Sequence, residues 1–415
     1  MKALQTSFAL ILFALSCSLL FATPPPGMVI GWGFNGNGEV CQTKGAIPMS
    51  STNVIFFQTN STESYVPRNG MMSMWTYYET SSPFSIGVVT IGGKILTNAI
   101  AVSGGNGHAL ALKSDGTVVG WGLNKYGQAT GVPSESFTNG QVTVGGIILS
   151  NVVEISAGYF DSLALKSDGT VVRWGGQPVY PHQVFPTGFG NLKTVAGGFA
   201  IGLGITSNGV AVGLDYTLDS GGDINHPMPW PHLPNGGTLS NIVAVAPARD
   251  GFPGLDSLAL KEDGTVVQWY SFGSPSSPDV SNVIAIAVGA GNYLALKSDG
   301  TVFGWGNNHY GQATGIPTEQ APYTSSGLVT LGGAVLSNVV AITSAGRHED
   351  NISHSMALKR DGTIVTWGNF GRYHIANVPI GLSNVVAIAS GGNDSSGFCL
   401  AITTNSPSLL RFQSP

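Results

Sequence analysis

The sequence is poor in charge: Asp, Glu, Lys and Arg together make up 9% of its 415 residues, and the formal net charge is −5. Nucleic-acid binders carry a dense basic surface, so this composition predicts no nucleic-acid partner. Three cysteines are too few for a disulfide scaffold. Helical periodicity is missing beyond residue 22, and Gly, Asn, Ser or Lys interrupts every later apolar run. We therefore expect an all-β chain with no membrane span.

The one long apolar run lies at the N-terminus. Lys2 precedes an apolar stretch over 8–21, which is followed by Ala22 and then by Thr-Pro-Pro-Pro. Its length suits the core of a signal peptide better than a transmembrane helix. The sequence predicts a signal peptide over 1–22, cleaved after Ala22, and an exported chain over 23–415. The destination is extracellular, periplasmic or the cell surface.

One stretch recurs along the whole chain. Its clearest form is His108-Ala-Leu-Ala-Leu-Lys-Ser-Asp-Gly-Thr-Val-Val-Gly-Trp-Gly122, in which two apolar runs flank Ser-Asp-Gly. Asp and Gly tolerate the backbone of a tight hairpin, so this pattern predicts strand, turn, strand. A further β-rich run precedes it at 98–105. One repeat is therefore expected to hold at least three short strands.

The copies of this unit are complementary at the two ends of the chain. The C-terminus supplies the first strands of a unit and the N-terminus supplies the missing one, as a closed ring without free sheet edges requires. We expect a single closed β-propeller with three to four strands per blade. Eight blades are favoured, and seven follow if 34–96 is an insertion. The units fall near 53–75, 98–122, 151–175, 191–214, 241–269, 282–306 and 338–368, with a split unit at 384–404 plus 28–33.

The repeat resembles those of the regulator-of-chromosome-condensation (RCC1-like) family. The shared pattern is Ser-Asn-Val-Val-Ala-Ile-Ala, then Asp-Gly-Thr-Val, then Trp-Gly-x-Asn-x-x-Gly-Gln, which is complete at 121–128 and 305–312. It is similar above all to secreted bacterial members, among them propeller-type β-lactamase inhibitor proteins. Such propellers usually have seven blades, fewer than the eight favoured here. The resemblance implies a rigid ring with loops on two faces.

The two faces differ in sequence. We call the face where the first strand of each unit ends the A face, and the opposite one the B face. The B-face turns repeat Lys-Ser-Asp-Gly-Thr, whereas two A-face loops are enlarged, at 247–256 and 344–353. Variable loops on a rigid scaffold are where binding residues gather. The predicted binding residues are Tyr126, Arg249, Asp250, Tyr310, Arg347, His348, Glu349 and Asp350.

No pattern in the sequence predicts catalysis. There is no nucleophile elbow, phosphate loop or paired-Cys metal site. One His beside two carboxylates at 348–350 is a weak metal or acid–base signal, because sequence neighbours rarely converge on one ion. His108 and His354 share a repeat position with Asp161, Asn292 and Phe398, which does not suit a catalytic group. We predict no catalytic residues, no metal and no cofactor.

Cys41 and Cys399 both belong to the split unit. An exported protein could oxidise them to a disulfide that joins its two halves.

The expected function is a non-enzymatic, exported and monomeric scaffold that binds a protein or glycan partner through the A face. Two alternatives stay open: a lyase or hydrolase acting on polysaccharide, and a structural module of a cell surface or matrix.

Overall fold

The structure is a computed structural model that describes residues 25–34, 84–135, 137–176, 192–198, 202–214, 238–247, 257–269, 278–347, 352–369, 378–379, 381–392 and 397–404. This part of the chain contains thirty β-strands and no helix, which confirms the all-β expectation. Accordingly, it offers no helix long and apolar enough to cross a membrane. The predicted signal peptide, Cys41 and the weak repeat copy at 53–75 lie outside the described residues.

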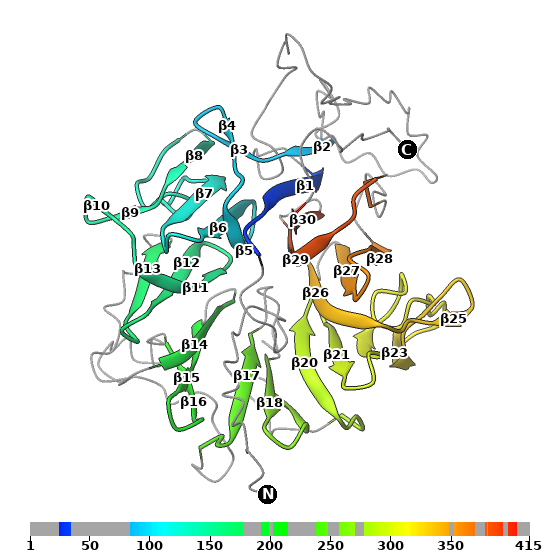
Figure 1. Cartoon of the computed structure of the whole chain (residues 1–415). Coiled ribbons are helices and arrows are strands. Elements are labelled where there is room, and N and C mark those ends of the chain that lie inside the picture. Colours follow the sequence, from blue (N-terminus) through cyan, green and yellow to red (C-terminus); the bar gives the residue numbers. More distant parts are fainter. Residues whose placement is uncertain are drawn as a thin grey trace, which may run out of the picture.

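Within these ranges, six sheets of three or four strands follow one another along the chain (Figure 1). The first is formed by β5 (Ala99–Gly104), β6 (His108–Lys113), β7 (Val118–Gly122) and β8 (Thr138–Gln141). The second and third are formed by β11 (Val152–Ala157), β12 (Asp161–Lys166) and β13 (Val171–Gly175), and by β14 (Leu192–Gly197), β15 (Gly202–Thr206) and β16 (Ala211–Gly213).

The next three sheets have the same antiparallel order. They are formed by β17 (Ile242–Ala246), β18 (Ser257–Lys261) and β19 (Val266–Trp269); by β20 (Val283–Val288), β21 (Asn292–Lys297), β22 (Val302–Asn307) and β23 (Thr324–Leu328); and by β26 (Val339–Arg347), β27 (Ile352–Lys359) and β28 (Ile364–Asn369).

A seventh sheet joins the two ends of the chain. Its order is β2 (Phe84–Val88), β1 (Met28–Phe34), β30 (Gly397–Thr403) and β29 (Val385–Gly392). The N-terminal strand β1 runs antiparallel to β30, with Trp32 opposite Cys399. This is the pairing that the complementary ends predict.

Three two-stranded hairpins link a fourth strand to the next sheet. They are β3 (Thr90–Ile91) with β4 (Lys94–Ile95), β9 (Thr143–Val144) with β10 (Ile147–Ile148), and β24 (Thr330–Leu331) with β25 (Ala334–Val335). Each turns at a Gly-Gly pair with positive φ at both residues, for example 61° and 79° at Gly145 and Gly146. Glycine adopts these values without strain, so the pair sets a tight two-residue turn.

The sheets are arranged about a common centre, and the innermost strand of each is the one that begins its repeat unit (Figure 1). Each inner strand contacts the next, and the last contacts the first. In order, the strands in this cycle are β5, β11, β14, β17, β20, β26 and β29.

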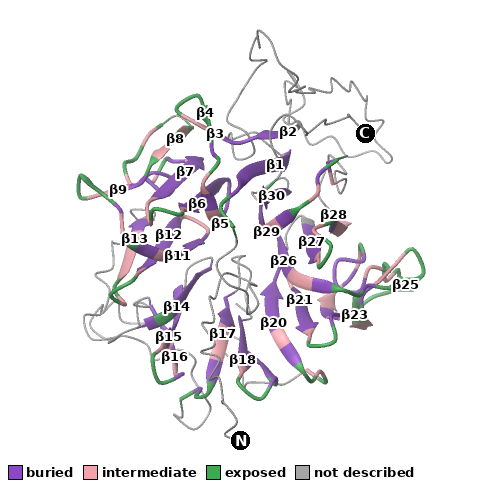
Figure 2. Cartoon of the chain, in the orientation of Figure 1, coloured by how far each residue is buried: buried purple, intermediate pink, exposed green. Residues whose placement is uncertain are grey.

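The core lies between the sheets. Each of seven apolar clusters in the described residues draws its members from two neighbouring sheets. One of them packs Leu110 and Val118 of the first sheet against Ile155 and Trp174 of the second. Figure 2 shows this burial along the facing strands. Full burial of one such side chain contributes about 2 kcal/mol, so the stacking of sheet on sheet stabilises the ring.

Two sequence features of the repeat have local structural causes. The Asn that begins a unit adopts left-handed φ, 58° at Asn282 and 59° at Asn338, which Asn tolerates better than most residues. In the Lys-Ser-Asp-Gly-Thr turn, the Asp299 carboxylate accepts hydrogen bonds from the backbone N–H and the hydroxyl of Thr301, at 2.9 and 2.6 Å. The Gly300 carbonyl then accepts the N–H of Val339 in the next sheet. The repeated B-face turn therefore joins neighbouring sheets.

Candidate binding face

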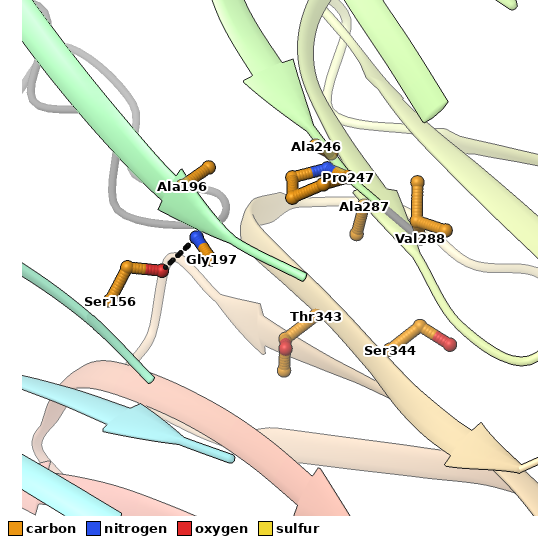
Figure 3. Close-up of a pocket in the computed structure, with 9 residues that line it drawn as sticks. All are labelled: Ser156, Ala196, Gly197, Ala246, Pro247, Ala287, Val288, Thr343 and Ser344. Atoms are coloured by element: carbon orange, nitrogen blue, oxygen red, sulfur yellow. Dashed lines mark hydrogen bonds between the residues drawn. The ribbon is translucent and has the colours of Figure 1, made fainter. Parts of the chain in front are cut away.

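The inner strands end together at the A face, around a narrow axial pocket. Five sheets contribute to its wall, four of them through the same two repeat positions and one through a single serine. The lining residues are Ser156, Ala196, Gly197, Ala246, Pro247, Ala287, Val288, Thr343 and Ser344 (Figure 3). The cavity volume is about 10 Å³, room for about one water molecule. This pocket therefore has no room for a ligand larger than a water molecule.

Hydroxyl groups bind the inner strands to one another at this depth. Ser103 Oγ accepts the N–H of Ala157 at 2.9 Å, and Ser156 Oγ accepts the N–H of Gly197 at 2.9 Å (Figure 3). Small hydroxyl side chains thus bond one sheet to the next around the pocket.

Two A-face loops are built around a buried asparagine. The Nδ2 group of Asn308 donates to Thr314 Oγ1, the Ile316 carbonyl and Thr318 Oγ1, at 2.7 to 2.9 Å, and its Oδ1 accepts two backbone N–H groups. Asn124 makes the same bonds except the one equivalent to Thr318. Both side chains are fully buried. The Asn of Trp-Gly-x-Asn is therefore structural, and the exposed loop positions are free to differ.

The glutamine of the same motif reaches the neighbouring sheet. The main-chain carbonyl of Gln312 accepts the indole N–H of Trp367 at 3.0 Å and the hydroxyl of Ser355 at 2.9 Å. The Gln128 carbonyl accepts the equivalent groups of Trp174 and Ser162. In these two sheets the repeated tryptophan thus packs and hydrogen-bonds between sheets and is not a stacking surface.

Tyr310 belongs to a stack of three rings on the A face. The imidazole of His309 lies 4.5 Å from the Tyr310 ring and 4.4 Å from the Tyr323 ring, with interplanar angles of 26° and 25°. Tyr310 is 41% exposed and Tyr323 is 39% exposed. Tyr310 was among the predicted binding residues, whereas His309 and Tyr323 were missed. The aromatic pair His309-Tyr310 in a repeated loop is the signal that could have revealed part of the stack.

Tyr126 occupies the same loop position in the first sheet, with a different outcome. Its ring meets that of Phe160 edge to face at 5.7 Å, and Phe160 meets Tyr159 at 4.4 Å. The Lys125 ammonium group lies 5.8 Å from the Tyr126 ring centre. All three rings are partly buried. This cluster closes the gap between two sheets, so Tyr126 offers less free ring surface than Tyr310.

A row of buried side chains lies just below the A face, at the start of the second strands. Burial lowers the pKa of His354 to about 4, and it raises the pKa of Asp161 although Arg173 lies 2.5 Å away and opposes the shift. His108 meets Ser162 of the next sheet at 2.9 Å through Nε2. His108 thus joins two sheets, whereas Asp161 pairs with Arg173 of its own sheet.

The enlarged loop at 344–353 begins as a raised hairpin. Strands β26 and β27 continue their pairing through Gly346 opposite Ser353 and Arg347 opposite Ile352. In the first two sheets the pairing of the inner strand ends earlier. The paired part of this hairpin is thus longer than in the first two sheets.

The other predicted binding residues are not placed. The side chain of Arg347, and residues Arg249, Asp250, His348, Glu349 and Asp350, lie outside the described residues. Cys399 is fully buried with a free thiol. Its predicted partner Cys41 is not described, so the disulfide stays a prediction.

No group of three or more His, Cys, Asp or Glu side chains in the described ranges is arranged to hold a metal ion. Glu154 is a carboxyl group buried within the fold, where burial raises its pKa well above the usual range. It accepts hydrogen bonds from the Thr194 hydroxyl at 2.8 Å and the Val195 N–H at 3.3 Å. These bonds join β11 to β14, so the group contributes to packing between sheets.

The stacked sheets, joined by loops that bond one sheet to the next, have the form of a β-propeller built from sequence repeats. The profile of the Regulator of chromosome condensation (RCC1) repeat matches residues 99–128 and 283–312. The protein therefore contains RCC1 repeats, one in its first sheet and one in its fifth.

Curated relatives match over short segments. The ultraviolet-B receptor UVR8 of Arabidopsis thaliana is 39% identical over 74 residues, which cover 18% of this chain and 17% of UVR8. Protein RCC1 of Candida albicans is 33% identical over 90 residues, 19% of this chain and 18% of that protein. The chain thus spans less than about a fifth of the length of these relatives.

Solved structures match the fold over most of the chain. Human WBSCR16 superposes with a TM-score of 0.59 at 18% identity, covering 91% of this chain and 100% of that chain. Prp20p from Saccharomyces cerevisiae, whose structure was reported with its binding properties to Gsp1p and histones, has a TM-score of 0.59 at 17% identity, covering 94% of each chain. At these identities the likeness concerns the fold alone.

Proposed function

We propose that this protein is an exported, non-enzymatic binding module that recognises a protein or glycan partner through the A face of a closed propeller. The observation that carries the proposal is the half-exposed ring stack of His309, Tyr310 and Tyr323 on a loop fixed by the buried Asn308. Exposed aromatic rings on a rigid support lose little conformational entropy when they bind.

We further propose seven blades, with the residues between β1 and β2 forming an insertion in the split blade. The cycle of contacts among seven inner strands supports this count, as do the seven apolar clusters between neighbouring sheets. The eight-blade alternative depends on the copy at 53–75. A closed ring of this kind gives the loops of one face fixed positions relative to one another.

Export is the second part of the proposal. The apolar run over 8–21 that ends at Ala22 supports a cleaved signal peptide. An exported destination also agrees with the resemblance to secreted bacterial propellers, including the β-lactamase inhibitor type. Detection of a mature N-terminus at Thr23 in the secreted or envelope fraction would test it.

Affinity capture tests the binding role. The full chain is exposed to the secreted and envelope fraction of its host, beside one variant with the 345–353 loop shortened and another carrying Tyr310→Ala. A B-face substitution, Lys297→Ala, is the matched control. We expect a partner that is lost with an A-face variant and retained with the control. A partner lost only with the control would refute the A-face assignment.

The polysaccharide-active enzyme and the structural module predict other results. An enzyme would shorten a polysaccharide during incubation and lose that activity when one carboxylate is replaced. A structural module would yield no partner that depends on A-face residues.

A further inference from the structure

We propose that the ring stack of His309, Tyr310 and Tyr323 is a platform for a neutral oligosaccharide. This inference rests on the proposed function and names the ligand class for one part of the A face.

The geometry of the stack leaves aromatic surface free. The His309 imidazole is nearly parallel to both tyrosine rings and within 4.5 Å of each, so it covers one face of either ring. Tyr310 and Tyr323 nevertheless remain 41% and 39% exposed. This exposed area lies on parts of the two residues that the imidazole does not cover.

The backbone holds the rings in place before any ligand arrives. Tyr323 has a φ of 57°, its carbonyl accepts the N–H of Asn308 at 2.7 Å, and its N–H donates to the Gln320 carbonyl at 3.0 Å. The N–H of Tyr310 donates to Gln312 Oε1 at 2.9 Å. A preformed platform avoids the entropic cost of ordering side chains on binding, which matters most for weakly binding ligands.

The chemistry of the stack suits a sugar ring. One face of a pyranose presents C–H groups that carry partial positive charge, and the face of an aromatic ring is partially negative. Sugar hydroxyls form hydrogen bonds with phenol and amide groups, and the loop supplies the tyrosine hydroxyls, Asn307 and Gln320. Residues 307–322 contain one carboxyl side chain, that of Glu319, and no Lys or Arg. This near-neutral surface favours a neutral sugar over an anionic one.

The equivalent loop of the first sheet uses its tyrosine differently. There, Tyr126 makes an edge-to-face contact with Phe160 of the next sheet, at an interplanar angle of 89°. The same backbone thus supports a packing contact in one blade and a parallel, exposed stack in another. A protein partner would be expected to anchor side chains in well-packed, desolvated pockets, whereas open ring faces fit a flat sugar ring.

Isothermal titration of the full chain with neutral hexasaccharides of glucose, xylose and N-acetylglucosamine tests the inference. We expect at least one to bind with a Kd between about 10 μM and 1 mM. Tyr310→Ala and Tyr323→Ala should each weaken binding at least roughly tenfold. Tyr310→Phe retains the ring and should stay within about threefold of the original chain. Lys297→Ala on the B face, the control of the capture experiment, should leave the affinity unchanged.

Two results would overturn the platform. One is the absence of binding by every hexasaccharide, and the other is an affinity that Tyr310→Ala and Tyr323→Ala leave intact. If a captured protein is lost with Tyr310→Ala while no sugar binds, the glycan assignment is wrong and the binding role stands. If neither sugar nor protein depends on the A face, both proposals fail.

Discussion

The loops around Asn124 and Asn308 share their backbone bonds and differ in what their exposed side chains do. In both, a buried asparagine donates to a main-chain carbonyl eight residues away, and the main-chain carbonyl of a glutamine accepts a hydrogen bond from the neighbouring sheet. In the first loop Tyr126 packs against Phe160, whereas in the second Tyr310 stacks on His309 and stays exposed. The repeat therefore conserves the support of the loop and leaves its surface free for different tasks.

The largest expected effect comes from removing that support. Asn308→Ala leaves several buried polar groups without partners, and we expect a loss of about 3 kcal/mol or more in the free energy of unfolding. Asn124→Ala should cost somewhat less, because Asn124 lacks the bond equivalent to the one at Thr318. Denaturant unfolding of both variants measures the difference. Equal stability of either variant and the original chain would show that the asparagine does not support the loop.

The stability of the fold should depend on pH, because a titratable residue of the next sheet lies beside each loop. His354 beside the second loop has a pKa of about 4 in the fold, below its value in the unfolded chain, so the unfolded chain binds more protons between about pH 6.5 and 4. Stability should fall as the pH drops through this window, by roughly 3 kcal/mol in all. His354→Asn should remove that fall, because asparagine occupies the same position at Asn292 in another blade.

Asp161, at the matching position beside the first loop, provides a control of opposite sign. Its pKa is raised in the fold, so its contribution to stability is present at low pH and is lost as the pH rises above the unfolded value of 3.8. Melting temperatures measured from pH 4 to 7 separate the two groups. A His354→Asn variant that keeps the full acid destabilisation would refute the assignment to this imidazole.

The smallest expected changes in stability come from Tyr126 and Tyr310, and they differ between the two residues. Tyr126→Ala removes an edge-to-face contact between sheets, and we expect a loss of about 2 kcal/mol. Tyr310→Ala removes an exposed ring and should change stability by less than about 0.5 kcal/mol. Thermal unfolding of the two variants under one condition provides the comparison. A larger loss for Tyr310→Ala would mean that its ring serves packing and would weaken its role as a binding surface.

Much of the fold could be predicted because the same pattern of strands and turns recurs many times along the sequence. The alternation of apolar runs with Asp-Gly turns indicates strands, and the incomplete units at the two ends predict the pairing of β1 with β30. The candidate site was harder to predict from the sequence. Tyr310 could be chosen as an exposed residue of a loop, but Tyr323 joins it only through the folded path of residues 308–323. Because that contact is tertiary, strand periodicity carries no trace of it.

The pairing of β1 with β30 also has a consequence for the time course of folding. During synthesis β1 appears among the first residues and its partner among the last, so the ring cannot close until nearly the whole chain has been made. Until then the neighbouring strands have free edges, and the slow search for a distant partner governs completion. Under the proposed export, this delay would keep the chain unfolded while it crosses the membrane.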